Sequence, residues 1–134
     1  MDALFTVNVI VKEVHELKSD LGQINMIVFE GGIDAPFFKG EILSGACDTQ
    51  KYLKGKEGML SARYMLKGRD DEENECLLFI ENNALIDNTG RWMTTPSIYT
   101  DSLRLKWLTE MKLRGEIEGS EKGVLIHFYE VDEK

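Results

Sequence analysis

The segment LFTVNVIVK, residues 4–12, alternates between two sets of side chains. In an extended chain one face would carry Phe5, Val7, Val9 and Val11, and the other Leu4, Thr6, Asn8 and Ile10. A period of two is typical of a β-strand, and β-branched residues favour that conformation. Residues 4–12 therefore predict a strand at the start of an all-β chain.

Comparable runs follow at intervals, separated by turn signals such as GGIDAP (31–36) and KGKEG (54–58). The further candidate strands are residues 23–30, 37–45, 47–53, 59–67, 76–82, 94–100 and 124–131, with the segment 103–118 still to be assigned. About eight to nine short strands with regular turns predict a barrel or a sandwich. The 134 residues contain no linker or repeat, so we expect a single β-barrel domain over residues 1–134.

Two segments need separate interpretation. The charge run KGRDDEENE, residues 67–75, lies between two apolar runs and predicts an exposed hairpin loop. Residues 101–114 fit two structures: Leu103, Trp107 and Met111 would share one face of a helix, whereas the odd positions from Leu105 to Leu113 would share one face of a strand. Propensity favours the helix, and the β-rich context favours the strand.

The composition excludes several classes of partner. The net charge is −8 and the isoelectric point is near 4.8, so the chain repels the phosphates of nucleic acids and anionic membrane surfaces. No segment approaches the roughly 20 apolar residues of a membrane helix.

Cys47 and Cys76 form no metal-binding or disulfide framework, although a bridge between them is an alternative. The N-terminal residues alternate like a strand rather than a signal peptide, so we expect a cytoplasmic protein.

Polar residues interrupt the apolar strand runs. They are Asn8, Asn25, Ser61, Arg63 and Asn82. An antiparallel sheet with one solvated face would show this pattern, and so would a closed barrel with a partly polar lumen. Periodicity alone leaves both arrangements open.

Several motifs give the chain a resemblance to a known family. They are GEILSGACDTQ (40–50), SARYML (61–66), IENNA (80–84), TTPSIYT (94–100) and LRLKWL (103–108). The chain resembles domain-of-unknown-function family 3237, also called uncharacterised protein family 0311, from residue 4 to residue 131. The shared positions are Gly40, Glu41, Gly45, Ala46, Asp48, Gln50, Ala62, Arg63, Tyr64, Asn82 or Asn83, Thr94 to Pro96, Trp107 and Leu108.

The resemblance implies a small antiparallel β-barrel, similar to allene oxide cyclase-type or other calycin-like barrels, and no established activity. This chain departs from the family pattern at Thr49, at Thr109 and at Met93, where members often carry an aromatic residue, an asparagine and a basic residue. If the family's pocket uses those groups, the ligand of this protein differs.

Arg63 and Asp48 are the leading site candidates. Alternation groups Arg63 with Met59, Ser61 and Met65, and we expect this face to point inward, with Tyr64 outward. A buried guanidinium needs a counter-ion, for which Asp48 is the natural partner, and its spare donors would suit a carboxylate, enolate or phosphate. The structural alternative is a salt bridge that joins two strands, or a surface arginine.

The remaining candidates would line the same pocket. Asp48 and Gln50 would face one side of a strand and either bind a ligand or cap a turn after Gly45. Asn82, Thr95 and Trp107 come from the family motifs, and Trp107, like Tyr64, is either a pocket wall or core. His15, expected in an exposed loop, and His127 show no metal-ligand spacing, so we expect no metal and no cofactor.

Three functions are compatible with these residues. The first is a barrel that binds a small organic acid or polyketide-like compound through Asp48, Gln50, Arg63, Asn82, Thr95 and Trp107. The second is a cofactor-independent isomerase, cyclase or hydratase in which Asp48 moves a proton and Arg63 stabilises negative charge. The third is an assembly module, such as a homodimer, whose lumen is filled by side chains.

Overall fold

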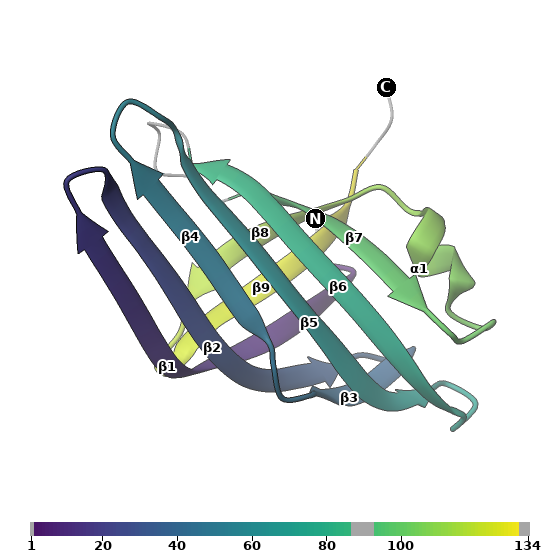
Figure 1. The fold of residues 1–134 in the computed structure, drawn as a ribbon. Coiled ribbons are helices and arrows are strands. Elements are labelled where there is room, and N and C mark those ends of the chain that lie inside the picture. Colours follow the sequence, from purple (N-terminus) through teal and green to yellow (C-terminus); the bar gives the residue numbers. More distant parts are fainter. Residues whose placement is uncertain (1, 87–92, 132–134) are drawn as a thin grey trace.

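The computed structural model describes residues 2–86 and 93–131, which form one twisted antiparallel sheet and one short helix (Figure 1). The elements are β1 (Phe5–Ser19), β2 (Gly22–Asp34), β3 (Phe38–Ile42), β4 (Cys47–Leu53), β5 (Gly58–Asp70), β6 (Glu75–Ile86), β7 (Met93–Thr100), α1 (Lys106–Glu110), β8 (Leu113–Gly119) and β9 (Gly123–Glu130).

The sheet closes on itself. Every strand pairs antiparallel with its neighbours, and β1 pairs with both β2 and β9, so the first and last strands complete the ring. β3 and β4 share one position: β3 pairs with one half of β2 and β5, and β4 with the other half. The result is a closed eight-strand barrel with one extra strand, which confirms the predicted fold class.

A bulge in β1 shapes one side of the barrel. Val11 is opposite Phe29, whereas Glu13 is opposite Val28, so Lys12 is the extra residue of the pair. Before the bulge the odd-numbered residues face the lumen, and after it the even-numbered residues do. The first half of β1 pairs with β9, and the second half continues with β2 alone as a hairpin.

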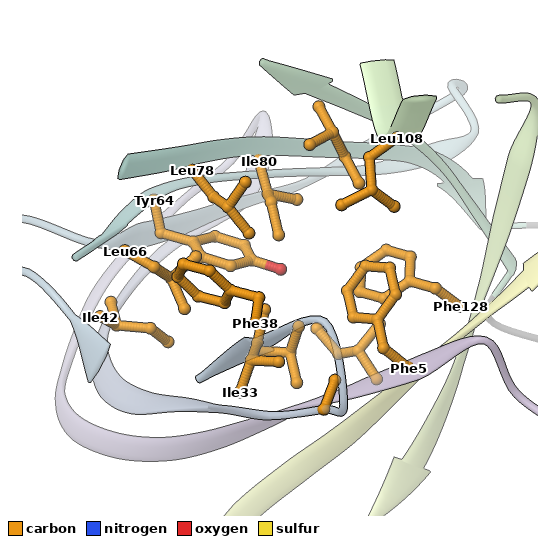
Figure 2. Close-up of a cluster of buried hydrophobic side chains, with 14 of the residues drawn as sticks. Phe5, Ile33, Phe38, Ile42, Tyr64, Leu66, Leu78, Ile80, Leu108 and Phe128 are labelled. Carbon is orange, nitrogen blue, oxygen red and sulfur yellow. The ribbon is translucent and has the colours of Figure 1, made fainter. Parts of the chain in front are cut away.

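The lumen is divided along the strands into a packed half and an open half. The packed half is filled by large apolar side chains drawn from most of the strands and from α1 (Figure 2), including Phe5, Ile33, Phe38, Leu66, Leu78, Ile80, Leu108 and Phe128. Phe5 stacks on Phe128 with ring centroids 4.5 Å apart. These buried side chains supply the apolar contacts that hold the closed sheet together.

The segment 101–114 is helix in part and strand in part. α1 spans Lys106–Glu110, and β8 begins at Leu113, so each of the two structures left open for this segment forms in one part of it. Leu105 and Leu108 are buried against the packed half, and a one-turn helix brings both to the same side. α1 therefore caps this end of the barrel.

The hairpin between β5 and β6 is tighter than its charge pattern predicts. β5 extends to Asp70 and β6 begins at Glu75, so the loop is residues 71–74 rather than 67–75. The Asp70 carboxylate accepts the backbone N–H groups of Glu72 and Asn74 at 2.9 and 3.0 Å, which closes the turn. His15 is exposed as predicted, but it lies in β1 rather than in a loop.

Candidate functional site

The open half of the lumen contains a cavity of about 390 Å³. Its wall is formed by inward-facing residues from eight strands: Val9, Val11, Ile27, Phe29, Asp48, Gln50, Leu60, Ala62, Asn82, Thr94, Ile117, Gly119, Val124 and Ile126. Ten of these fourteen residues are apolar or glycine, so the cavity is a mostly apolar space with four polar side chains. Its volume lies in the range of small-molecule sites.

The cavity exists because small residues occupy key inward positions. Ala62 stands in the middle of the wall, with Asp48 opposite it on β4 and Asn82 opposite it on β6. Farther along β5, the inward positions carry Tyr64 and Leu66, which are buried in the core. The change from alanine to these larger residues along one strand marks the boundary between the two halves.

Among the residues that the structure describes, Asp48 is the only acidic or basic one in the cavity wall. The Gln50 side chain donates its Nε2–H to Asp48 Oδ2 at 3.1 Å, and Asp48 Oδ1 is buried with no hydrogen-bond partner among the described residues. Burial raises the pKa of the Asp48 carboxyl, and the hydrogen bond from Gln50 opposes that rise only in part. Asp48 therefore keeps one buried oxygen unpaired at the cavity wall, among the described residues.

A chain of hydrogen bonds connects Gln50 to more exposed groups on β1, β2 and β4. Gln50 Oε1 accepts from Asn25 Nδ2 at 3.4 Å and from the Tyr52 hydroxyl at 3.3 Å. Asn25 Oδ1 in turn accepts from Gln23 Nε2 at 2.8 Å, and that nitrogen also lies 2.9 Å from Glu16 Oε2. Because Asn25 and Tyr52 occupy the carbonyl oxygen of the Gln50 side chain, its amide NH₂ group is directed toward Asp48.

Asn82 supplies the second unpaired group. It is only 1% exposed, and its Oδ1 accepts the Thr94 hydroxyl at 3.1 Å, whereas its Nδ2 has no hydrogen-bond partner among the described residues. Gly115 makes room for this pair: a Cβ there would lie 2.2 Å from Thr94 Oγ1. The contact with Thr94 therefore leaves the N–H donors of Asn82 available.

The inward orientation expected for Arg63 is wrong. Arg63 is exposed on the outer face, opposite Cys47 on β4 and Glu81 on β6, whereas Ala62 and Tyr64 are buried. Both faces of β5 carry apolar residues, but the face with Leu60, Tyr64 and Leu66 has more apolar area to bury. Arg63 therefore provides no cation to the cavity and no partner to Asp48.

Two further predicted site residues also lie outside the cavity. Thr95 is exposed on β7, and its neighbour Thr94 occupies the inward position. Trp107 lies on α1 at the other end, where its ring meets the edge of Phe37 with centroids 5.1 Å apart. Asp48, Gln50 and Asn82 line the cavity, and their role in ligand binding stays a prediction; Tyr64 belongs to the core rather than to the outer face.

The histidines lie outside the cavity wall. His127 faces outward, where its Nδ1 lies 2.8 Å from the Thr6 hydroxyl and its Nε2 lies 2.9 Å from Glu118 Oε1. Residues 2–86 and 93–131 contain no group of three or more His, Cys, Asp or Glu that could hold a metal ion. In the same residues both cysteines are free thiols, and no helix has the length and hydropathy needed to cross a membrane.

Two larger depressions lie outside this cavity. One, of about 620 Å³, runs along β1, β2 and β3 near Gly31 and Gly40, and the other, of about 650 Å³, lies beside the β5–β6 turn. Both are more open to solvent and more polar than the lumen cavity, and neither is lined by a buried polar atom without a partner. We therefore take the lumen as the candidate site.

Solved structures of similar fold cover almost the whole chain. A protein of unknown function from Clostridium acetobutylicum is 23% identical with a TM-score of 0.79, over 98% of this chain and 95% of that one. A β-barrel-like protein from Acinetobacter baumannii is 19% identical with a TM-score of 0.73, over 98% and 94%. An enzyme from Penicillium herquei is 15% identical with a TM-score of 0.70, over 98% and 92%. These likenesses establish the fold.

No curated protein matches the chain. The model of a family described as proteins of unknown function, DUF3237, matches residues 1–91, which include the motifs around Asp48 and Arg63 but not Thr94–Pro96 or Trp107. Since the match spans more than half of the chain, this barrel belongs to the DUF3237 family.

Proposed function

We propose that the barrel binds one small, neutral organic molecule in the open half of its lumen. The observation that carries this proposal is the presence of two buried polar atoms, Asp48 Oδ1 and Asn82 Nδ2, at the wall of an apolar cavity, neither with a partner in the part of the chain that the structure describes. Buried polar atoms are nearly always hydrogen-bonded, because an unmade bond costs about 1–3 kcal/mol. A guest with suitable groups would satisfy both.

The cavity wall defines the chemistry of that guest. The expectation of an organic acid depended on Arg63, and with Arg63 outside, the described residues of the wall supply an anion-repelling carboxylate and no cation. A hydroxyl group would donate to Asp48 Oδ1, and a carbonyl group would accept from Asn82 Nδ2. A flat, hydroxylated or keto ring compound of the polyketide type meets these requirements, since its remaining surface would contact Phe29, Ile117 and the other apolar residues.

The alternative of a purely structural assembly module predicts a lumen filled by side chains. About 390 Å³ of the lumen is unfilled, which favours the binding function. A homodimer stays a prediction.

Thermal unfolding with two matched probes tests the proposal. 2-Naphthol and 2-naphthoate share one ring system, but at neutral pH the first is an uncharged hydroxyl compound and the second an anion. We expect 2-naphthol to raise the Tm in a concentration-dependent manner and 2-naphthoate to have a much smaller effect. Ala62→Leu, which fills the cavity, should abolish the response, and Arg63→Ala should leave it unchanged.

The opposite results would overturn the proposal. They are a larger response to 2-naphthoate that disappears in Arg63→Ala, or an undiminished response to 2-naphthol in Ala62→Leu, which would place the guest outside the lumen. Absence of any response to 2-naphthol in the unmodified protein would equally contradict it.

A further inference from the structure

Asp48 and Asn82 face the same part of the cavity from two strands. Asp48 is directly opposite Ala62, and Ala62 is directly opposite Asn82, so the three residues form one inward-facing row across β4, β5 and β6. Neighbouring strands lie about 4.8 Å apart, which places the backbones of Asp48 and Asn82 about 10 Å from each other. Because Ala62 contributes only a methyl group, the space between the two polar side chains is open to a guest.

The free atoms of the two side chains differ in kind. Gln50 occupies Asp48 Oδ2, so the carboxylate oxygen left for the cavity is the acceptor Oδ1. Thr94 occupies Asn82 Oδ1, so the group left on Asn82 is the donor Nδ2. A guest in this row would therefore meet a proton acceptor on one side and an N–H donor on the other.

This pairing is the one that proton transfer next to a carbonyl group requires. Such a reaction needs a base about 3–3.5 Å from the carbon that loses its proton, and a donor at about 2.9 Å from the carbonyl oxygen, where negative charge develops. The row places the two side chains on either side of Ala62, so a C–C=O unit above Ala62 would have the base on one side and the donor on the other. Apolar walls strengthen both interactions, because they exclude water from the reacting atoms.

We propose that the barrel catalyses keto–enol proton transfer in a neutral ketone guest, with Asp48 as the base and Asn82 as the donor to the carbonyl oxygen. This inference rests on the proposed function, since the guest must first bind in the lumen.

The electron flow balances without any co-reactant. Asp48 Oδ1 takes the proton from the carbon beside the carbonyl, and the C–H electron pair becomes the carbon–carbon π bond of an enolate. The carbonyl π pair moves to the oxygen, which accepts a hydrogen bond from Asn82 Nδ2. Asp48 then returns the proton to the same carbon, or to a conjugated carbon, and the carbonyl is restored. The net reaction is proton exchange or isomerisation.

The surroundings of Asp48 suit a base. Burial raises the pKa of its carboxyl, which makes the carboxylate a stronger proton acceptor than an exposed aspartate. Gln50 is a positioning residue, because its bond occupies Oδ2 and leaves Oδ1 unpaired at the cavity wall, and Asn25 and Tyr52 hold Gln50 in that orientation.

Hydrogen–deuterium exchange into 2-tetralone, a neutral bicyclic ketone, tests the inference. The loss of the proton signals beside the carbonyl is followed by ¹H NMR in D₂O, and binding of the same compound is measured separately by saturation transfer from protein to ligand. We expect the unmodified protein to bind 2-tetralone and to accelerate exchange above the buffer rate. Asp48→Asn should bind it and lose the acceleration, a factor of about 10²–10⁴ for a general base.

Two further variants sharpen the test. Asn82→Leu keeps the branched shape of the side chain and removes the donor, so it should slow exchange by about 10²–10³. Asp20→Asn makes the same change as Asp48→Asn on the exposed β1–β2 turn and should match the unmodified protein.

The outcomes separate the two proposals. Binding of 2-tetralone without accelerated exchange would overturn catalysis and leave the binding function standing. Acceleration that persists in Asp48→Asn would overturn the role of Asp48. If 2-tetralone fails to bind at all, the proposed function fails, and this inference fails with it.

Discussion

At the scale of single residues, Asp48 combines a charge with a buried, largely apolar position. Burial raises the pKa of its carboxyl above the ordinary value of 3.8, with the Gln50 hydrogen bond acting in the opposite direction. Burial of the Tyr52 hydroxyl raises the pKa of Tyr52, and the negative charge of Asp48 raises it further. Tyr52 therefore stays uncharged at neutral pH. The carboxylate is therefore held in the fold at a cost to stability.

That cost has a defined pH dependence. In the pH window between the ordinary pKa and the raised one, the folded protein binds more protons at Asp48 than the unfolded chain, so this contribution to stability falls as pH rises. Above the raised pKa the full penalty is present, and below 3.8 it is absent. Asp48→Asn should therefore increase the free energy of unfolding at neutral pH, and the gain should shrink toward acid pH.

Urea unfolding of both proteins at several pH values measures this difference. Asp20→Asn on the exposed turn is the control and should show no such gain. A gain for Asp48→Asn that stays constant with pH, or grows toward acid pH, would contradict the explanation.

Tyr64 carries the third buried polar atom without a partner among the described residues. Its ring packs edge-on against Phe29 with centroids 5.3 Å apart, and its hydroxyl points into the barrel interior (Figure 2). Tyr64→Phe keeps the ring and removes the unsatisfied hydroxyl, so we expect the free energy of unfolding to rise by up to about 1 kcal/mol. Tyr99→Phe removes an exposed hydroxyl and should change little. A clear loss of stability in Tyr64→Phe, measured by urea unfolding, would mean that the hydroxyl is bonded.

At the scale of elements, β7 and β8 approach each other so closely at Gly115 that a Cβ atom there would collide with a neighbouring side chain. Gly115 lies opposite Thr94, and a Cβ at position 115 would collide with the hydroxyl that holds Asn82. Gly115→Ala should therefore cost about 1–3 kcal/mol of unfolding free energy. Because Thr94→Ala removes the colliding oxygen, the double variant should be more stable than the sum of the two single effects implies. Strict additivity in that double-mutant cycle would refute the collision.

The strands were predictable because their alternation is strong, as in β1, where Phe5, Val7 and Val9 are buried. The bulge at Lys12 was not predictable, since it arises from pairing with β2 rather than from any local signal. The facing of β5 was predicted wrongly because both of its faces carry apolar residues, and only the closed barrel shows which face is enclosed. Thr95 was predicted from the family motif at Thr94 to Pro96, and that motif does not indicate which of the two threonines faces the lumen.

At the scale of the whole molecule, the cavity is a part of the lumen that side chains do not fill, so the barrel lacks packing contacts there. Ala62→Leu would bury about three more methylene-sized groups in that space, so we expect the ligand-free protein to gain about 1–2 kcal/mol of unfolding free energy. Ala35→Leu makes the same change in the packed half, where overpacking should cost about 1–3 kcal/mol. Urea unfolding measures both variants. If the two changes have the same sign, the division of the lumen described above is wrong.

The division of the lumen also bears on protein engineering. Val9, Ile27, Ile117 and Val124 border the cavity, whereas the buried aromatic side chains Phe38 and Phe128 lie farther along the strands. A library that randomises only the four residues bordering the cavity would change the shape of the binding site, while the packed half would still stabilise the barrel. Such libraries could yield receptors for new compounds from a chain of modest length.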